Sequence, residues 1–202
     1  MTTNATVRKE LASLEKMTTG DLRATILTHP CGFARPEILL WLAASGVPID
    51  EEHVDTVCAA PHADALNLAI ECTLASRFDE CLFVEHDLLC WPKDLEDFWT
   101  VDGDGVCARY GSAEWWAKPE RAFHLGLWRT RREVLEACGP PWAVEGEPGC
   151  LCQSLARRFR AASFTITVAG SVLHHRPACR AEVAAHTRAH AEAQAADPIP
   201  SG

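Results

Sequence analysis

Two acidic residues, Glu85 and Asp87, follow a short apolar run and are the residues of this chain best suited to chemistry. The run covers residues 81–84 (CLFV), and its length and composition predict a buried strand. Side chains alternate along a strand, so Glu85 and Asp87 should face one side and His86 the other. Paired carboxylates repel each other unless a cation lies between them, and such hard oxygen ligands favour Mg²⁺ or Mn²⁺. A solvated strand end with two unrelated acids is the alternative.

The elements around these acids alternate between strand and helix. Apolar patterns and turn residues predict strands at 22–28, 54–59, 81–85, 106–110, 123–128 and 164–168, and helices at 36–44, from 64, 92–98, 131–137 and 151–159. This order predicts an α/β fold with a parallel sheet and helices on its faces. The acids would then lie at the carboxyl edge of the sheet, where open α/β folds bind ligands.

Composition narrows the classes of protein that fit. The chain has 202 residues, of which 48% are hydrophobic, so one globular domain is expected. Its net charge of −9 argues against nucleic acid as a partner, although a local patch at Arg129, Arg131 and Arg132 leaves contact with phosphate open. The sequence shows neither a long apolar span nor an apolar signal core, so we expect a cytoplasmic protein without a membrane segment.

The cysteines do not form a recognisable ligand or disulfide pattern. The chain contains ten of them, and Cys58, Cys72, Cys81 and Cys107 lie in apolar periodic segments, which is typical of reduced core residues. The sequence contains no C-x-x-C pair, so we expect no structural zinc site.

Four segments, taken in order, resemble motifs of a known enzyme family. They are residues 64–70 (DALNLAI), 82–92 (LFVEHD followed by Pro92), 126–147 (from GLWR through REVLEACGPPW to GE) and 172–175 (VLHH). The chain thus resembles the nucleotide-sugar glycosyltransferases of the GT-A fold, especially small family-2-like members, with residues 85–87 where that family has its D-x-D motif. The resemblance spans about residues 22–177 and implies a GT-A (Rossmann-like), mostly parallel central sheet flanked by helices.

The resemblance implies transfer of a sugar from a nucleotide-diphosphate-sugar donor to a hydroxyl acceptor of unknown identity. A divalent ion, Mn²⁺ or Mg²⁺, would neutralise the leaving diphosphate. Its ligands would be Glu85, Asp87 and one of His174 and His175; a surface or interface role is the alternative for the two histidines.

The resemblance also implies a catalytic base in the acidic loop before residue 151. Glu147 takes this place, with Glu145 as a substitute, and a plain solvated loop acid is the alternative. Pro148 replaces the aspartate that follows in the family, which would weaken or abolish activity where that aspartate is the base.

Donor and acceptor contacts follow less directly. By resemblance, Thr28, Arg35, Asp64 and Asn67 would contact the donor together with Glu85, although the acid-rich D-D-G-S segment of many relatives is replaced here by residues 58–62 (CAAPH). Three tryptophans in expected loops offer stacking faces for an acceptor, with satellite core packing as the alternative. They are Trp115, Trp116 and Trp142.

We expect three parts: an N-terminal helical extension (1–20), a GT-A-like catalytic domain (21–178), and an Ala-rich C-terminal helix with a flexible tail (179–202). Two other functions stay open. A nucleotidyltransferase also pairs acids for Mg²⁺, but it would be favoured by a basic, Gly-rich loop after the first strand, and residues 28–34 lack a basic residue. A degenerate GT-A scaffold that binds a partner is suggested by Pro148 and by the missing D-D-G-S segment.

Overall fold

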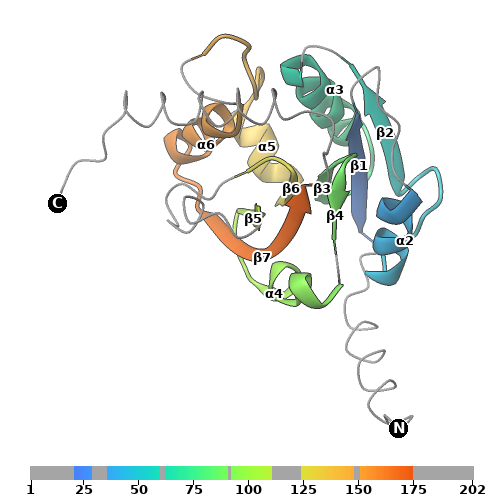
Figure 1. Cartoon of the computed structure of the whole chain (residues 1–202). Helices are drawn as coiled ribbons and strands as arrows, with labels where there is room; N and C mark the ends of the chain where they lie inside the picture. The colour runs from blue at the N-terminus through green and yellow to red at the C-terminus, as the bar shows by residue number, and fades with distance from the viewer. Residues whose placement is uncertain are drawn as a thin grey trace, which may run out of the picture.

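The computed structural model describes residues 21–28, 36–59, 62–90, 92–110, 124–147 and 151–174 (Figure 1). Strands and helices alternate along most of this chain, as the sequence predicts. The elements are β1 (Leu22–Thr28), α2 (Pro36–Ala44), β2 (Val54–Cys58), α3 (His62–Leu74), β3 (Glu80–Glu85), β4 (Leu88–Leu89), η1 (Pro92–Leu95), α4 (Glu96–Thr100), β5 (Gly105–Tyr110), β6 (Leu127–Arg131), α5 (Arg132–Cys138), α6 (Leu151–Ala161) and β7 (Ile166–His174).

The described strands form one seven-stranded sheet in the order β2-β1-β3-β6-β5-β7-β4. Strand β1 pairs in parallel with both β2 and β3, and β5 pairs in parallel with β7. Strand β6 is antiparallel to β3 and β5, and β4 is antiparallel to β7. Five strands therefore run one way and two the other, so the sheet is mostly parallel, as expected.

Helices cover both faces of this sheet, so the domain has three layers (Figure 1). On one face α3, α5 and α6 pack in a cluster that contains Leu66, Ile70, Leu135 and Phe159. On the other face α2, η1 and α4 pack in a second cluster, to which Trp41 belongs. Both clusters bury apolar side chains that alternate along the central strands, which is why residues 81–84 of β3 form a continuous apolar run.

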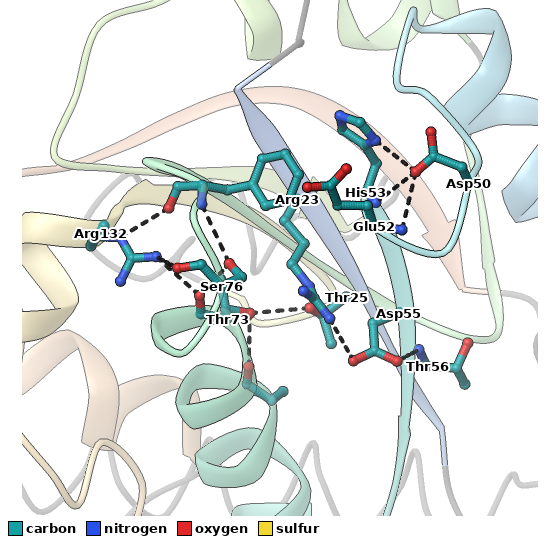
Figure 2. A network of polar contacts seen from close by, with 12 residues as sticks. Arg23, Thr25, Asp50, Glu52, His53, Asp55, Thr56, Thr73, Ser76 and Arg132 are labelled. Carbon is teal, nitrogen blue, oxygen red and sulfur yellow. Dashed lines mark hydrogen bonds and ion pairs between the residues drawn. The ribbon is translucent and has the colours of Figure 1, made fainter.

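The carboxyl-terminal end of α3 is fixed by one arginine. The Arg132 guanidinium, at the start of α5, donates to the backbone oxygens of Thr73 and Leu74 in the last turn of α3 and to those of Ser76 and Phe78 just beyond it (Figure 2). The Thr73 hydroxyl also contacts a threonine hydroxyl of β1 at 3.2 Å. These contacts fix α3 against the sheet.

A second polar group lies at the amino-terminal end of β2 (Figure 2). His53 Nδ1 lies 2.7 Å from Asp50 Oδ1, and Arg77 pairs with Glu52. On β2 itself, Asp55 accepts a hydrogen bond from an arginine of the neighbouring strand. This group is at the opposite end of β2 from the start of α3, so it does not belong to the predicted ligand edge.

Strand β7 contains a bulge. Against β5, Cys107 pairs with Val168 and Arg109 with Ser171, so β7 carries one extra residue between these two pairs. Gly170 lies in this bulge with φ +72°, and a Cβ there would come within 2.8 Å of the backbone oxygen of Asp94. Only glycine fits both the backbone conformation and the close approach.

The described cysteines are free thiols, and their burial only partly follows the expectation. Cys81 and Cys107 are buried, and burial raises the pKa of the Cys81 thiol to about 12. Cys72 is half-buried, and Cys58 is exposed because it ends the edge strand β2, so the prediction that Cys58 is a core residue is wrong. Separately, among the helices that the structure describes, none combines the length and apolarity needed to cross a membrane.

Candidate functional site

The order of the first three strands places a topological switch point between β1 and β3. From β1 the chain passes through α2 to β2 on one side of β1, and from β2 it passes through α3 to β3 on the other side. Helices α2 and α3 lie on opposite faces of the sheet. Such a topological switch point leaves an opening beyond the carboxyl ends of the two strands, which is the usual ligand site of open α/β sheets.

Three side chains reach this switch point from three elements. Thr28 ends β1, Glu85 ends β3, and His62 begins α3. The carboxyl end of β3 is fixed by backbone hydrogen bonds, since Glu85 N–H donates to Gly126 O at 2.7 Å and His86 N–H to Leu27 O at 3.0 Å. Glu85 is therefore presented from a rigid strand end.

His86 faces away from this group. Its Nδ1 lies 3.2 Å from the backbone oxygen of Leu27 on β1. The imidazole thus contacts the backbone of β1, while the Glu85 carboxylate contacts another histidine.

That other histidine is His62. Its Nε2 lies 3.6 Å from Glu85 Oε1, with side-chain exposures of 48% for His62 and 16% for Glu85. From the sequence, His62 stands out only as part of the segment that replaces the D-D-G-S motif. A usable signal was its position at the start of the helix that follows β2, since helix starts in this fold lie at the same edge as strand ends.

Asp87 is 6% exposed and directly precedes β4. The β4–β7 pairing places the backbone of His174 opposite Leu88, so the end of β7 runs past the residue that follows Asp87. The side chain of His174 and all of His175 lie outside the described residues. The end of β7 therefore lies beside the segment that follows Glu85 and Asp87, the predicted metal ligands. Metal binding by the side chains of His174 and His175 stays a prediction.

Within the described part of the chain, no three His, Cys, Asp or Glu side chains come together closely enough to hold a metal ion. The described residues thus offer pairs of ligands at most. Carboxylate oxygens from Glu85 and Asp87 still fit Mg²⁺ or Mn²⁺, because Mg²⁺ in particular is commonly held by one or two carboxylates plus water and substrate phosphates.

The residues predicted to contact the nucleotide-sugar donor lie on β1 and α3 where the structure describes them. Thr28 is buried at the end of β1, and Asp64 is exposed in the first turn of α3. Asn67 is engaged inside the protein instead: its amide nitrogen donates to Ala143 O at 2.8 Å and its amide oxygen accepts from Ala143 N–H at 3.0 Å. Arg35 lies outside the described residues.

Glu147 is held by three side chains of α6. Its carboxylate accepts hydrogen bonds from Ser154, Arg157 and Arg158, and the Arg158 contact is 2.7 Å long. The Ser154 hydrogen bond, followed by the charge of Arg158, lowers the pKa of Glu147. Such a carboxylate is a weaker base than a free one, whereas Glu145, two residues earlier, is exposed.

The predicted acceptor platform is only partly within the described chain. Trp142 is 3% exposed and its indole N–H donates to Leu135 O at 2.8 Å, so the ring belongs to the core, which is the alternative that the sequence left open. Trp115 and Trp116 lie outside the described residues.

No protein-family model matches the chain, and no curated protein matches it. Among solved structures, a mycobacterial protein is similar at 17% identity over 95% of this chain and 80% of that chain, with a TM-score of 0.51. This likeness supports the α/β fold and says nothing of function.

Two further solved structures are similar at TM-scores below 0.5. One is a Drosophila galactosyltransferase in complex with manganese, UDP-Gal and xylobiose, at 14% identity over 73% of this chain, with a TM-score of 0.47. This chain spans 65% of the length of that enzyme. The other is a putative nucleotide-diphospho-sugar transferase from Desulfovibrio desulfuricans, at 14% identity over 81% of this chain and 69% of that chain, with a TM-score of 0.42.

Proposed function

We propose that this chain is a divalent-metal-dependent glycosyltransferase of the GT-A type, which moves a sugar from a nucleotide-diphosphate-sugar donor to a hydroxyl acceptor. The observation that carries the proposal is the switch point between β1 and β3, with Thr28, Glu85 and the start of α3 around it. Two of the four segments that resemble this family lie beside the switch point: residues 64–70 in α3, and residues 82–85 in β3.

Glu85 and Asp87 would hold the cation, with His174 or His175 completing its protein ligands. A cation at this position would neutralise the charge that develops on the leaving nucleoside diphosphate. This need is acute in a chain with a net charge of −9, because the site must attract an anionic donor. Thr28, at the end of β1, and Asp64, in the first turn of α3, would contact the donor at the switch point between β1 and β3.

The acceptor hydroxyl must lose a proton, and Glu145 suits this task better than Glu147. Asn67 holds the backbone of Ala143 against α3 by two hydrogen bonds. Asn67 itself lies five residues after His62, which is about 7.5 Å along the helix axis. Glu145 therefore follows a backbone position that is fixed near the site, whereas the contacts of Glu147 with α6 lower its pKa and keep it ionised. Glu147 would then hold the loop that carries the base.

The test is release of nucleoside diphosphate from a panel of nucleotide-diphosphate sugars with Mn²⁺, with Mg²⁺ and with EDTA. Asp87→Asn should lower the metal-dependent release by about a hundredfold. Loss of a residue that only hydrogen-bonds a metal ligand already lowers activity by about 10- to 100-fold, and loss of a carboxylate at the metal should lower it at least as much. The matched control is Asp97→Asn, which changes an exposed carboxylate on α4 and should leave release unchanged. Release that EDTA does not affect would contradict the proposal.

The commitment of Glu147 to three contacts of α6 favours a second candidate, a degenerate GT-A scaffold that binds a nucleotide sugar without turning it over. Calorimetric titration separates the two candidates. Metal-dependent binding of donor without any release of nucleoside diphosphate would support the scaffold.

A further inference from the structure

We propose that His62 is a metal ligand, and that its Nε2 and Glu85 Oε1 together hold one divalent cation. The inference rests on the cation of the proposed function and adds a ligand that the sequence motifs do not assign. It also changes which metals the site should prefer. His62 and Glu85 would bind the ion directly and Asp87 would act through a bound water, because no three His, Cys, Asp or Glu side chains come together in the described part of the chain.

The separation of the two atoms is the first argument. Two ligands of one cation, each bound at about 2.1 Å, lie roughly 3 to 3.6 Å apart at common coordination angles. The observed distance from His62 Nε2 to Glu85 Oε1 is 3.6 Å, which is too long for a direct hydrogen bond and suits a shared cation.

The other histidine–carboxylate pair in the described chain provides the contrast. His53 Nδ1 and Asp50 Oδ1 are 2.7 Å apart, which is a direct hydrogen bond that leaves no room for an ion. That pair lies at the amino-terminal end of β2, away from the switch point. The two pairs thus share their chemistry and differ in spacing and position.

The second argument is that both residues sit on rigid elements. Glu85 ends a strand whose backbone is hydrogen-bonded to Gly126, and His62 begins a helix whose far end is capped by Arg132. A site on fixed elements loses little entropy when it binds a metal. At 48% side-chain exposure, His62 also leaves a route by which a cation can enter from solvent.

An imidazole ligand changes metal preference. Oxygen ligands alone suit Mg²⁺. A nitrogen ligand raises the affinity for transition metals, and the affinity is higher for Co²⁺ than for Mn²⁺. With His62 as a ligand, the site should bind Mn²⁺ and Co²⁺ more tightly than Mg²⁺. Without the imidazole, this preference should shrink.

The test measures metal binding alone, in the absence of any nucleotide sugar. Mn²⁺, Co²⁺ and Mg²⁺ are titrated calorimetrically into the wild-type chain, His62→Gln and, as the matched control, His53→Gln. We expect His62→Gln to weaken Mn²⁺ and Co²⁺ binding by about 10- to 100-fold, with less than a threefold change for Mg²⁺. His53→Gln should bind all three metals like the wild type.

A second measurement needs no variant. In an NMR spectrum of the imidazole nitrogens, substoichiometric Mn²⁺ should broaden the His62 signals and leave those of His53 sharp. Unchanged His62 signals, or Mn²⁺ affinity within threefold of wild type in folded His62→Gln, would overturn the inference.

The outcomes also separate this inference from the proposed function. Mn²⁺ binding that requires His62, in a chain that releases no nucleoside diphosphate from any donor, would support the ligand and contradict the enzyme. Metal-dependent release that is unaltered in His62→Gln, with unaltered Mn²⁺ affinity, would support the enzyme and overturn the ligand.

Discussion

The side-chain amide of Asn67 exchanges two hydrogen bonds with the backbone of Ala143, at 2.8 and 3.0 Å, across 76 residues of sequence. This pair joins the middle of α3 to the segment that leads to Glu145 and Glu147. Because α3 begins at His62, the same helix positions both the proposed metal edge and the acidic loop. The asparagine that the sequence assigns to the donor thus has a structural partner in the fold.

Replacing Asn67 by alanine should destabilise the protein by about 1 to 3 kcal/mol, because it leaves the buried N–H and C=O groups of Ala143 without partners. Urea denaturation measures the change. Asn67→Asp keeps the acceptor for Ala143 N–H and loses the donor, so it should also be destabilised. An alanine variant as stable as the wild type would show that this pair does not fix the segment.

Glu147→Gln should make the free energy of unfolding less dependent on pH in the acidic range. The pKa of Glu147 is lowered in the folded state below its ordinary value of 4.5, so its ionised form stabilises the fold above about pH 4.5. This contribution is lost as the pH falls through the lowered folded-state pKa.

Denaturation at several pH values checks this expectation. At pH 7 the wild type should be more stable than Glu147→Gln by about 1 kcal/mol or less, because the carboxylate is 29% exposed. Below about pH 4.5 the difference should shrink as the pH falls. A difference that stays constant over this range would mean that the charge of Glu147 contributes nothing.

The Asp55 carboxylate, on the edge strand β2, accepts hydrogen bonds from two groups. Its Oδ2 accepts a hydrogen bond from Arg23 at 2.9 Å, and its Oδ1 accepts from the backbone N–H of Thr56 at 2.8 Å (Figure 2). Asp55→Ala should cost about 1 to 2 kcal/mol, since the half-buried Arg23 loses its carboxylate. Combining it with Arg23→Met in a double-mutant cycle should give a coupling energy of about 1 kcal/mol in urea denaturation. A coupling energy near zero would rule out a stabilising ion pair.

Helix α2 offers a matched pair of leucines. Leu42 is fully buried and Leu40 is 71% exposed, although they are two residues apart in an apolar helix. Leu42→Ala should destabilise the protein by about 2 to 5 kcal/mol, and Leu40→Ala by less than about 0.5 kcal/mol. Thermal or urea denaturation measures both. The reverse order would mean that α2 faces the sheet with its other side.

The sequence predicts the first half of the fold closely. The expected strand at 22–28 and helix at 36–44 match β1 and α2 at both ends, because a Pro in the first turn and Gly46 after the last mark that helix. The helix expected from residue 64 corresponds to α3, whose apolar residues Leu66, Ala69 and Ile70 recur at helical spacing and are buried against the sheet. These are local signals, carried by residues a few positions apart.

The second half depends on distant pairing and is predicted less well. The strand expected at 123–128 is found at Leu127–Arg131, and the strand expected to end at residue 168 continues to His174. The two residues of β4 form a strand only because β7 lies beside them, and no local pattern signals that pairing. The antiparallel direction of β6 is set in the same way, by its neighbours β3 and β5.

The candidate site shows the same division. The position of Glu85 at the end of a strand follows from its local sequence, but the contact with His62 joins residues 62 and 85 through a crossover. The sequence places Trp142 in a loop and leaves core packing open as the alternative to an acceptor platform; in the structure, the carbonyl of Leu135 accepts its indole N–H inside the core. A tryptophan in a loop carries no local mark of which side of the chain it will face.

The extra residue at the Gly170 bulge reverses the alternation of β7. Before it, Ile166 and Val168 pack against the layer of α3, α5 and α6; after it, Val172 joins the layer of α2 and α4. In an unbroken strand, these three even-numbered positions would share one face. The pairing with β5 therefore sets the face of Val172, because paired residues of neighbouring strands lie on the same side of a sheet. Deleting Gly170 would keep these pairs and leave Val172 in its layer, whereas an unbroken strand of the present length would move Val172 to the layer of α3, α5 and α6.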